Sequence, residues 1–89
     1  MAHKSETELL GMLESALSLV EVGATYSHYK DPQKLYIVRT LTFSEADDSV
    51  MVVYEALYGN HFSFVRPLYS WLETVPLDGV DVPRFKKKS

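Results

Sequence analysis

The sequence predicts a mainly β protein: a small barrel of five or six short strands, preceded by one amphipathic α-helix. Apolar side chains in residues 5–22 recur with the period of a helix, whereas residues 24–85 contain short β-branched and aromatic segments separated by turn signals. All eleven aromatic residues also follow Gly23, so the two parts differ in composition. We therefore divide the chain into a helical extension (1–23), a β-barrel domain (24–85) and a basic tail (86–89).

Length and composition indicate one small folded domain. The chain has 89 residues, of which 46% are hydrophobic and 24% charged, and its net charge is −3. Because it contains no cysteine, disulfides, thiolate zinc sites and a cysteine nucleophile are excluded, and we expect a cytoplasmic protein. Glu14 and Glu21 interrupt the best apolar run, so neither a secretory signal nor a membrane span is predicted.

The predicted helix covers residues 5–22. Ser5 and Glu8 have the spacing of a capping box, and Gly23 stands where a left-handed residue commonly ends a helix. The apolar half of its surface is wider than the stripe of about 100° that packing on one partner needs. We therefore expect the helix to pack partly on the barrel and partly on a second copy, giving a homodimer. This half contains Leu9, Leu10, Met12, Leu13, Ala16, Leu17, Leu19 and Val20.

The predicted strands are short and end at turn residues. In the strand 50–58 the even positions carry no charge, so we expect the even set to face inward. Residues 68–73 are expected to form a helical turn, and Asp78-Gly79 a hairpin turn. So many short strands cannot form two full sheets, and closure into a barrel would remove exposed edges. The other strands are expected at 24–29, 35–43, 61–66, 74–77 and 80–85.

Several short motifs resemble, in the same order, the bacterial family known as domain of unknown function 1653. They are Tyr26-Ser27-His28-Tyr29-Lys30, Tyr36 with Val38, Ser44-Glu45, Val52-Val53-Tyr54-Glu55-Ala56-Leu57-Tyr58-Gly59, Val65-Arg66-Pro67-Leu68 and Pro83-Arg84-Phe85. The resemblance covers residues 25–85. It implies an SH3-like β-barrel, and it implies no reaction, cofactor or ligand. Ser27 and Phe64 stand where the family usually has arginine and tryptophan.

Arg66 is the first candidate for a binding residue, because it ends a largely apolar strand just before Pro67. A partly buried guanidinium is usually paired, so we expect Arg66 to join strands through Glu45, Glu55 or Glu73. In the alternative, Arg66 recognises an anion in a cleft lined by aromatic side chains. The candidate binding residues are Arg66, Tyr54, Tyr58, Trp71 and Glu45.

Catalytic, cofactor and metal sites are not predicted. His3, His28 and His61 lack the spacing of a metal site, the four glycines form no phosphate-binding motif, and no serine–histidine–acid set can be named. Glu45, Asp47 and Asp48 are expected to be solvated in an exposed turn. Glu45 is the strongest candidate of the three because it belongs to a family motif.

The sequence therefore favours a non-enzymatic binding or interaction module with an unknown ligand or protein partner. A nucleic-acid or nucleotide-binding barrel is the alternative, and an enzyme whose site is not visible in the sequence is the third hypothesis. Arg84 and Lys86 to Lys88 could contact phosphates, but residues 23–83 carry a net charge of −4, which opposes a polyanion. A membrane surface is not expected, because the polar side of the helix carries glutamates rather than lysines.

Overall fold

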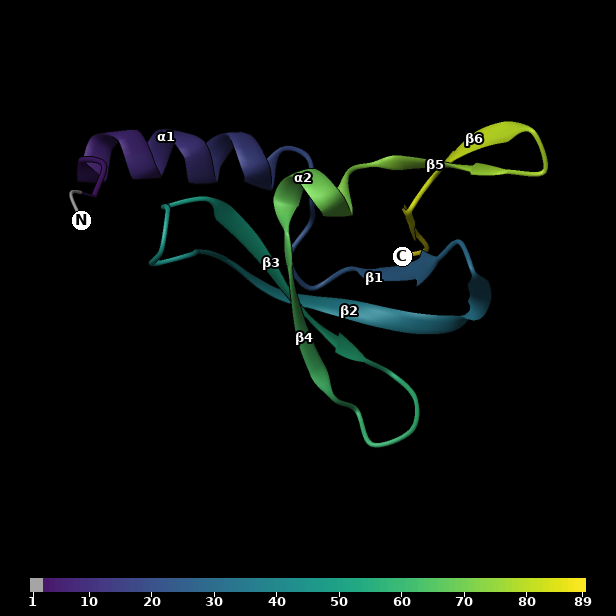
Figure 1. Cartoon of the computed structure of the whole chain (residues 1–89). Coiled ribbons are helices and arrows are strands. Elements are labelled where there is room, and N and C mark those ends of the chain that lie inside the picture. Colours follow the sequence, from purple (N-terminus) through teal and green to yellow (C-terminus); the bar gives the residue numbers. More distant parts are fainter. Residues whose placement is uncertain (1–2) are drawn as a thin grey trace.

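The computed structural model describes residues 3–89, which form a mainly β fold with one long and one short helix (Figure 1). Both helices lie on the same side of the main sheet, and a separate hairpin extends beyond it. In chain order the elements are α1 (Glu6–Leu17), β1 (Thr25–His28), β2 (Asp31–Phe43), β3 (Val50–Ala56), β4 (Ser63–Pro67), α2 (Leu68–Trp71), β5 (Thr74–Leu77), β6 (Val80–Pro83) and β7 (Phe85–Lys87).

The main sheet is open, so the predicted closed barrel is wrong. Its five antiparallel strands have the order β4-β3-β2-β1-β7, while β5 and β6 pair only with each other among the described residues. A flat sheet of five strands would place its edges roughly 19 Å apart. The Arg66 guanidinium in β4 nevertheless lies 5.5 Å from the ring centre of Phe85 in β7. The sheet is therefore strongly curled, but its two edge strands, β4 and β7, do not pair with each other. In the chain, α2 and the β5–β6 hairpin lie between these two strands.

Helix α1 begins as predicted and ends early. The Ser5 hydroxyl accepts from the Glu8 amide at 3.2 Å, and the Glu8 carboxylate accepts from the Ser5 amide at 3.2 Å, which completes the capping box. The helix ends at Leu17, where the Ser18 hydroxyl donates to the Ser15 carbonyl at 2.6 Å. Gly23 has a φ of +89° but lies beyond the helix end. Its amide donates to the Val38 carbonyl at 2.8 Å, so it joins the chain to β2.

One side of α1 packs on the sheet and another remains exposed. Ala16 is buried in the core, as is Val20 just beyond the helix end, and Met12 and Leu13 pack against the core. Leu10 and Leu17 are 56% and 47% exposed, and Leu19, beyond the helix end, is 60% exposed. The apolar half is thus divided between a covered and an uncovered side. No helix within residues 3–89 combines the length and the apolar character needed to cross a membrane.

Strands β2 and β3 carry most of the sheet side of the core. Along β3 the even positions Val50, Val52, Tyr54 and Ala56 are buried, as predicted. In β2, Val38 and Leu41 are both buried although they are three residues apart. The register explains this: Val38 pairs with Tyr54 and Thr40 with Val53, so Arg39 is an extra residue in a β-bulge. Inward-facing residues of β2 are therefore even-numbered before the bulge, as Val38 is, and odd-numbered after it, as Leu41 is.

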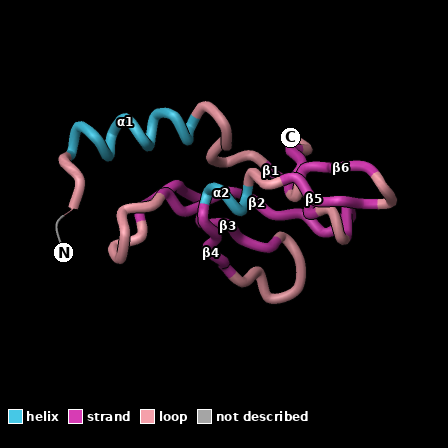
Figure 2. The backbone as a smooth tube through the Cα atoms, turned by 45° about the horizontal axis from the view of Figure 1, so that its top comes forward, coloured by secondary structure: helices cyan, strands magenta, loops and turns pink. Residues whose placement is uncertain are grey.

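In the tube view the turn of the β5–β6 hairpin lies at the end of the molecule opposite the N-terminal segment (Figure 2). Asp78 and Gly79 both have positive φ, +51° and +81°, which is the geometry of a tight two-residue hairpin turn. The hairpin was predicted at these residues. The last predicted strand is divided in two, because β6 ends at Pro83 and β7 begins at Phe85.

Candidate functional site

Aromatic rings from distant parts of the chain form the centre of the molecule. Trp71 of α2 stacks on Phe85 of β7, with ring centres 3.7 Å apart and planes 4° from parallel. Tyr54 meets both rings edge-on, at 5.0 and 5.6 Å. Such pairs stabilise beyond the burial of their area, so they hold the positions of the rings relative to one another.

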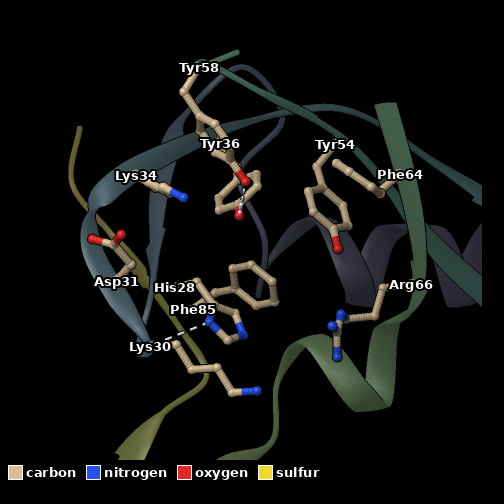
Figure 3. Close-up of a pocket in the computed structure, with 10 residues that line it drawn as sticks. All are labelled: His28, Lys30, Asp31, Lys34, Tyr36, Tyr54, Tyr58, Phe64, Arg66 and Phe85. Atoms are coloured by element: carbon tan, nitrogen blue, oxygen red, sulfur yellow. Dashed lines mark hydrogen bonds between the residues drawn. The ribbon is translucent and has the colours of Figure 1, made fainter. Parts of the chain in front are cut away.

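A cavity of about 430 Å³ opens on this aromatic centre, and all five strands of the main sheet contribute to its wall (Figure 3). We call it the aromatic cavity. Its size is within the range of about 300–1,000 Å³ that is typical of small-molecule sites. The curl of the open sheet creates it, because β4 and β7 face each other across the cavity without pairing. Its lining residues are His28, Lys30, Asp31, Lys34, Tyr36, Tyr54, Tyr58, Phe64, Arg66 and Phe85.

An irregularity between β1 and β2 supplies the polar side of this wall. Ser27 pairs with Leu35, but the next residue, His28, pairs with Asp31. Residues 32–34 therefore have no partner in β1, and the start of β2 departs from a regular ladder. Figure 3 shows Lys34, Asp31 and His28 on the side of the cavity opposite Arg66.

Arg66 lies on the cavity wall without a carboxylate partner among the described residues. Its guanidinium donates to the Ser70 hydroxyl at 2.9 Å and lies over the ring of Phe85. The acids expected to pair with it are engaged elsewhere or distant: Glu55 pairs with Arg39 at 2.9 Å and Glu73 with Arg84 at 3.0 Å. The predicted carboxylate clamp is therefore wrong. Most of the donors of a half-buried guanidinium remain available to an anion.

A pair of tyrosines bounds the cavity near Lys34. The hydroxyls of Tyr36 and Tyr58 are 2.6 Å apart, so one donates to the other. Burial and this hydrogen bond raise the pKa of Tyr36 to about 12. The Lys34 ammonium lies 5.0 Å from the ring centre of Tyr58, a cation–π contact. This part of the wall offers both an O–H donor and a positive charge.

His28 lies between two groups of rings. Its imidazole centre is 5.0 Å from Phe85 and 4.7 Å from Tyr29. Burial lowers the pKa of His28 below its ordinary value, and the positive charges of Arg66, Arg84 and Lys30 lower it further. The ring is therefore neutral at pH 7. The Lys30 amide donates to Nδ1 at 3.2 Å, so Nε2 carries the proton and can donate.

A second cavity, of about 350 Å³, lies between β1, the start of β2, the β5–β6 hairpin and β7. Its lining is mostly apolar, with two lysines, and His28 belongs to both cavities. Ser27, Tyr29, Pro32, Leu77, Val82, Pro83, Lys86 and Lys88 complete the lining.

The structure brings three of the five predicted site residues together. Arg66, Tyr54 and Tyr58 line the aromatic cavity. Trp71, at 2% exposed, lies behind Phe85 and supports the wall without lining it. Glu45 is exposed between β2 and β3 and lines neither of the two cavities.

The remaining lining residues were not predicted as site residues. Tyr36, His28 and Phe85 occur in the family motifs, which was the only signal that could have selected them. Nothing in their spacing shows that the curled sheet brings β1, β2 and β7 to one cavity. Lys30 also belongs to a family motif, whereas Lys34 has no motif beyond its position near the β1–β2 turn.

The acidic turn between β2 and β3 has a structural role that the sequence did not predict. Asp48 is buried, in contrast to the expected solvated carboxylate. Its carboxylate accepts from His3 Nδ1 at 2.7 Å and from the Lys4 amide at 2.8 Å, which fixes the segment before α1. Among residues 3–89, no three His, Asp or Glu side chains are grouped so that they could hold a metal ion.

Comparison with known proteins places the β part of the chain in a family. A family model described as Protein of unknown function (DUF1653) matches residues 24–87. The crystal structure of a protein belonging to DUF1653 from Bordetella bronchiseptica is similar, with 33% sequence identity and a TM-score of 0.63. The match covers 72% of this chain and 82% of that one. Among curated proteins no match is found. The chain belongs to the DUF1653 family, as its motifs predicted.

Proposed function

We propose that this protein is a non-catalytic binding module whose aromatic cavity holds a small anion that carries a flat ring. The observation that carries the proposal is the position of Arg66: it lies half-buried on the cavity wall and has no carboxylate partner within residues 3–89. A guanidinium removed from bulk water binds carboxylate or phosphate oxygens strongly, because its donors match their geometry.

The rest of the wall supports a ligand with a ring. Tyr54, Phe64 and Phe85 present aromatic surface beside Arg66, while Lys34 adds a second positive charge across the cavity (Figure 3). Rings bound in such a site gain from stacked and edge-to-face contacts. The positive charges therefore favour the anionic group of the ligand, and the aromatic surface favours its ring.

Fluorescence titration with phenyl phosphate tests the proposal, because the single tryptophan, Trp71, stacks on the cavity wall and reports on it. We expect phenyl phosphate to bind and to change the Trp71 emission, and inorganic phosphate to bind at least tenfold more weakly. Arg66→Met should weaken phenyl phosphate binding by about 10- to 100-fold, because hydrogen bonds to charged groups contribute about 1.5–3 kcal/mol.

Arg39→Met is the matched control. It also removes one positive charge, but Arg39 is an exposed bulge residue that pairs with Glu55 and lines neither cavity. Its affinity for phenyl phosphate should equal that of the wild type. Equal affinities of the wild type and Arg66→Met would refute the proposed site.

A catalytic function draws no support from the described side chains. A cytoplasmic location stays a prediction from the cysteine-free sequence.

A further inference from the structure

The two cavities meet at a single side chain. His28 lines both of them, and its ring contacts Phe85, which lines the aromatic cavity, and Tyr29, which lines the second cavity. A ligand that fills the aromatic cavity can therefore extend past His28 into the second cavity. The second cavity is bounded by flat or rigid apolar groups, among them Tyr29, Pro32 and Pro83.

The charge of the protein is strongly segregated toward these cavities. Five of the nine lysine and arginine residues line them, together with only one of the twelve acidic residues, Asp31. The other four basic and eleven acidic side chains lie elsewhere. The net charge of −3 thus hides a local excess of positive charge, which attracts a polyanion to the two cavities. The five basic residues are Lys30, Lys34, Arg66, Lys86 and Lys88.

We propose that the two cavities form one track for single-stranded nucleic acid, with one base in the aromatic cavity and the next base in the second cavity. The phosphate between these bases lies beside Lys30 and His28. This inference rests on the proposed function, since it identifies the ring-bearing anion as a nucleotide and extends its binding site.

The combination of rings and charges favours a nucleic acid over an acidic peptide. A single strand alternates flat rings with phosphates, and each cavity combines ring or apolar surface with positive charge: Lys30, Lys34 and Arg66 in the aromatic cavity, and Lys86 and Lys88 in the mostly apolar second cavity. Aromatic side chains and positive charges are the usual means of binding single strands. An acidic peptide would match the lysines and leave the ring surfaces unused.

His28 can contact the phosphate without carrying a charge. Its Nδ1 accepts from the Lys30 amide at 3.2 Å, so Nε2–H is the group left to donate to a phosphate oxygen. Lys30 supplies the charge from two residues further along the chain.

Titration of the full chain with thymidine 5′-monophosphate, the dinucleotide TpT and the tetranucleotide (dT)4 tests the track. We expect TpT to bind at least fivefold more tightly than the mononucleotide, because a second base then stacks in the second cavity. Leu77→Ser should remove this gain while leaving the affinity for the mononucleotide unchanged. Val80→Ser is the matched control: Val80 pairs with Leu77 across the hairpin but does not line the cavity, so the gain should persist.

Salt dependence provides a second readout. Lys86→Met should reduce the slope of log affinity against log salt for (dT)4 by about 0.7, the value for one phosphate contact with a single strand. Lys87→Met should leave the slope unchanged, because Lys87 pairs with Glu21 at 2.6 Å and lines neither cavity.

Several outcomes would overturn the track. TpT binding no tighter than thymidine 5′-monophosphate, or tetraglutamate binding as tightly as (dT)4, would reject nucleic acid while leaving the aromatic cavity as a site for one anion. Binding of phenyl phosphate but of no nucleotide would do the same. If neither phenyl phosphate nor any nucleotide bound, both the track and the proposed function would be wrong.

Discussion

Trp71 and Phe85 lie flat against each other, 3.7 Å between ring centres, although one belongs to α2 and the other to β7. Helix α2 follows the edge strand β4 in the chain, and β7 is the opposite edge strand of the main sheet. The stack therefore joins the two edges. It therefore maintains the curl of the sheet, and with it the aromatic cavity. Trp71 supports the site from behind, and Phe85 presents its other side to the cavity.

Trp71→Ala should lower the free energy of unfolding by about 3–5 kcal/mol, the usual cost of truncating a buried large aromatic side chain. Because this variant contains no tryptophan, urea unfolding has to be followed by far-UV circular dichroism. Tyr69→Ala is the matched control in the same short helix. Tyr69 is 72% exposed, so its truncation should change stability by less than about 0.5 kcal/mol. Similar losses in the two variants would contradict the structural role of the stack.

The sequence predicted what depends on neighbouring residues and missed what depends on the curl of the sheet. The capping box of α1, the alternation of β3 and the Asp78-Gly79 hairpin all follow from local patterns, and all were correct. The bulge at Arg39 was not predicted, because it depends on the pairing of β2 with β3. Without knowledge of this bulge, the sequence could not show which residues of β2 face inward on both sides of Arg39.

The candidate site shows the same division. Tyr54, Tyr58 and Arg66 were selected from two adjacent strands, where side-chain alternation is informative. Phe85 and His28 were missed because they reach the cavity only when the edges of the sheet approach each other. Closure of the barrel was predicted from the number and spacing of the strands and from the family resemblance, and neither reveals that β4 and β7 stay unpaired at the two edges of the sheet.

His28 makes stability depend on pH in a defined direction. Burial, followed by the charges of Arg66, Arg84 and Lys30, places its pKa in the folded protein below the unfolded value of about 6.5. The unfolded chain therefore binds a proton that the folded chain resists, and stability falls as pH drops below 6.5. His28→Gln removes this proton uptake, so the variant should lose less stability than the wild type between pH 7 and pH 5. Parallel pH curves in urea unfolding would contradict the burial of a neutral imidazole.

Binding should show the opposite pH dependence. A phosphate beside His28 favours the imidazolium strongly enough to replace the hydrogen bond that Nδ1 accepts from the Lys30 amide, so binding of TpT should take up protons and tighten as pH falls from 7.5 to 6. TpT is suitable because its phosphodiester does not titrate in this range. The same titrations with His28→Gln should show a flatter pH dependence. The charges that act on the imidazole are those of Arg66, Arg84 and Lys30, and the two cavities that it lines also contain Asp31, Lys34, Lys86 and Lys88.

Asp48 should control the order of the segment before α1. Asp48→Gly removes the acceptor for His3 and for the Lys4 amide, while glycine adopts the φ of +59° at this position without strain. We expect the Lys4 amide to exchange with solvent much faster in the variant, measured by hydrogen–deuterium exchange. Asp47→Gly is the control, since the hydrogen bonds of Asp47 are to Ser49 and Ser44 within the same turn. Unchanged Lys4 exchange in Asp48→Gly would contradict this role.

The homodimer expected from the sequence remains a prediction, and the structure defines which side of α1 would form it. Leu10 and Leu17 lie two turns apart on one side of the helix and are both about half exposed. Leu13 packs against the core, so replacing it would report on stability rather than on association.

Covering the exposed parts of Leu10 and Leu17 in both subunits would contribute about 3–6 kcal/mol, roughly half the value for fully burying four leucine side chains. Association costs about 4–15 kcal/mol, so only a weak, concentration-dependent dimer is expected. Sedimentation velocity at rising concentration should show this dimer for the wild type and a monomer for the double variant Leu10→Gln, Leu17→Gln. Ser15→Gln, on the exposed opposite side of α1, should sediment like the wild type. A wild type that stays monomeric at high micromolar concentration would show that α1 only covers its own sheet.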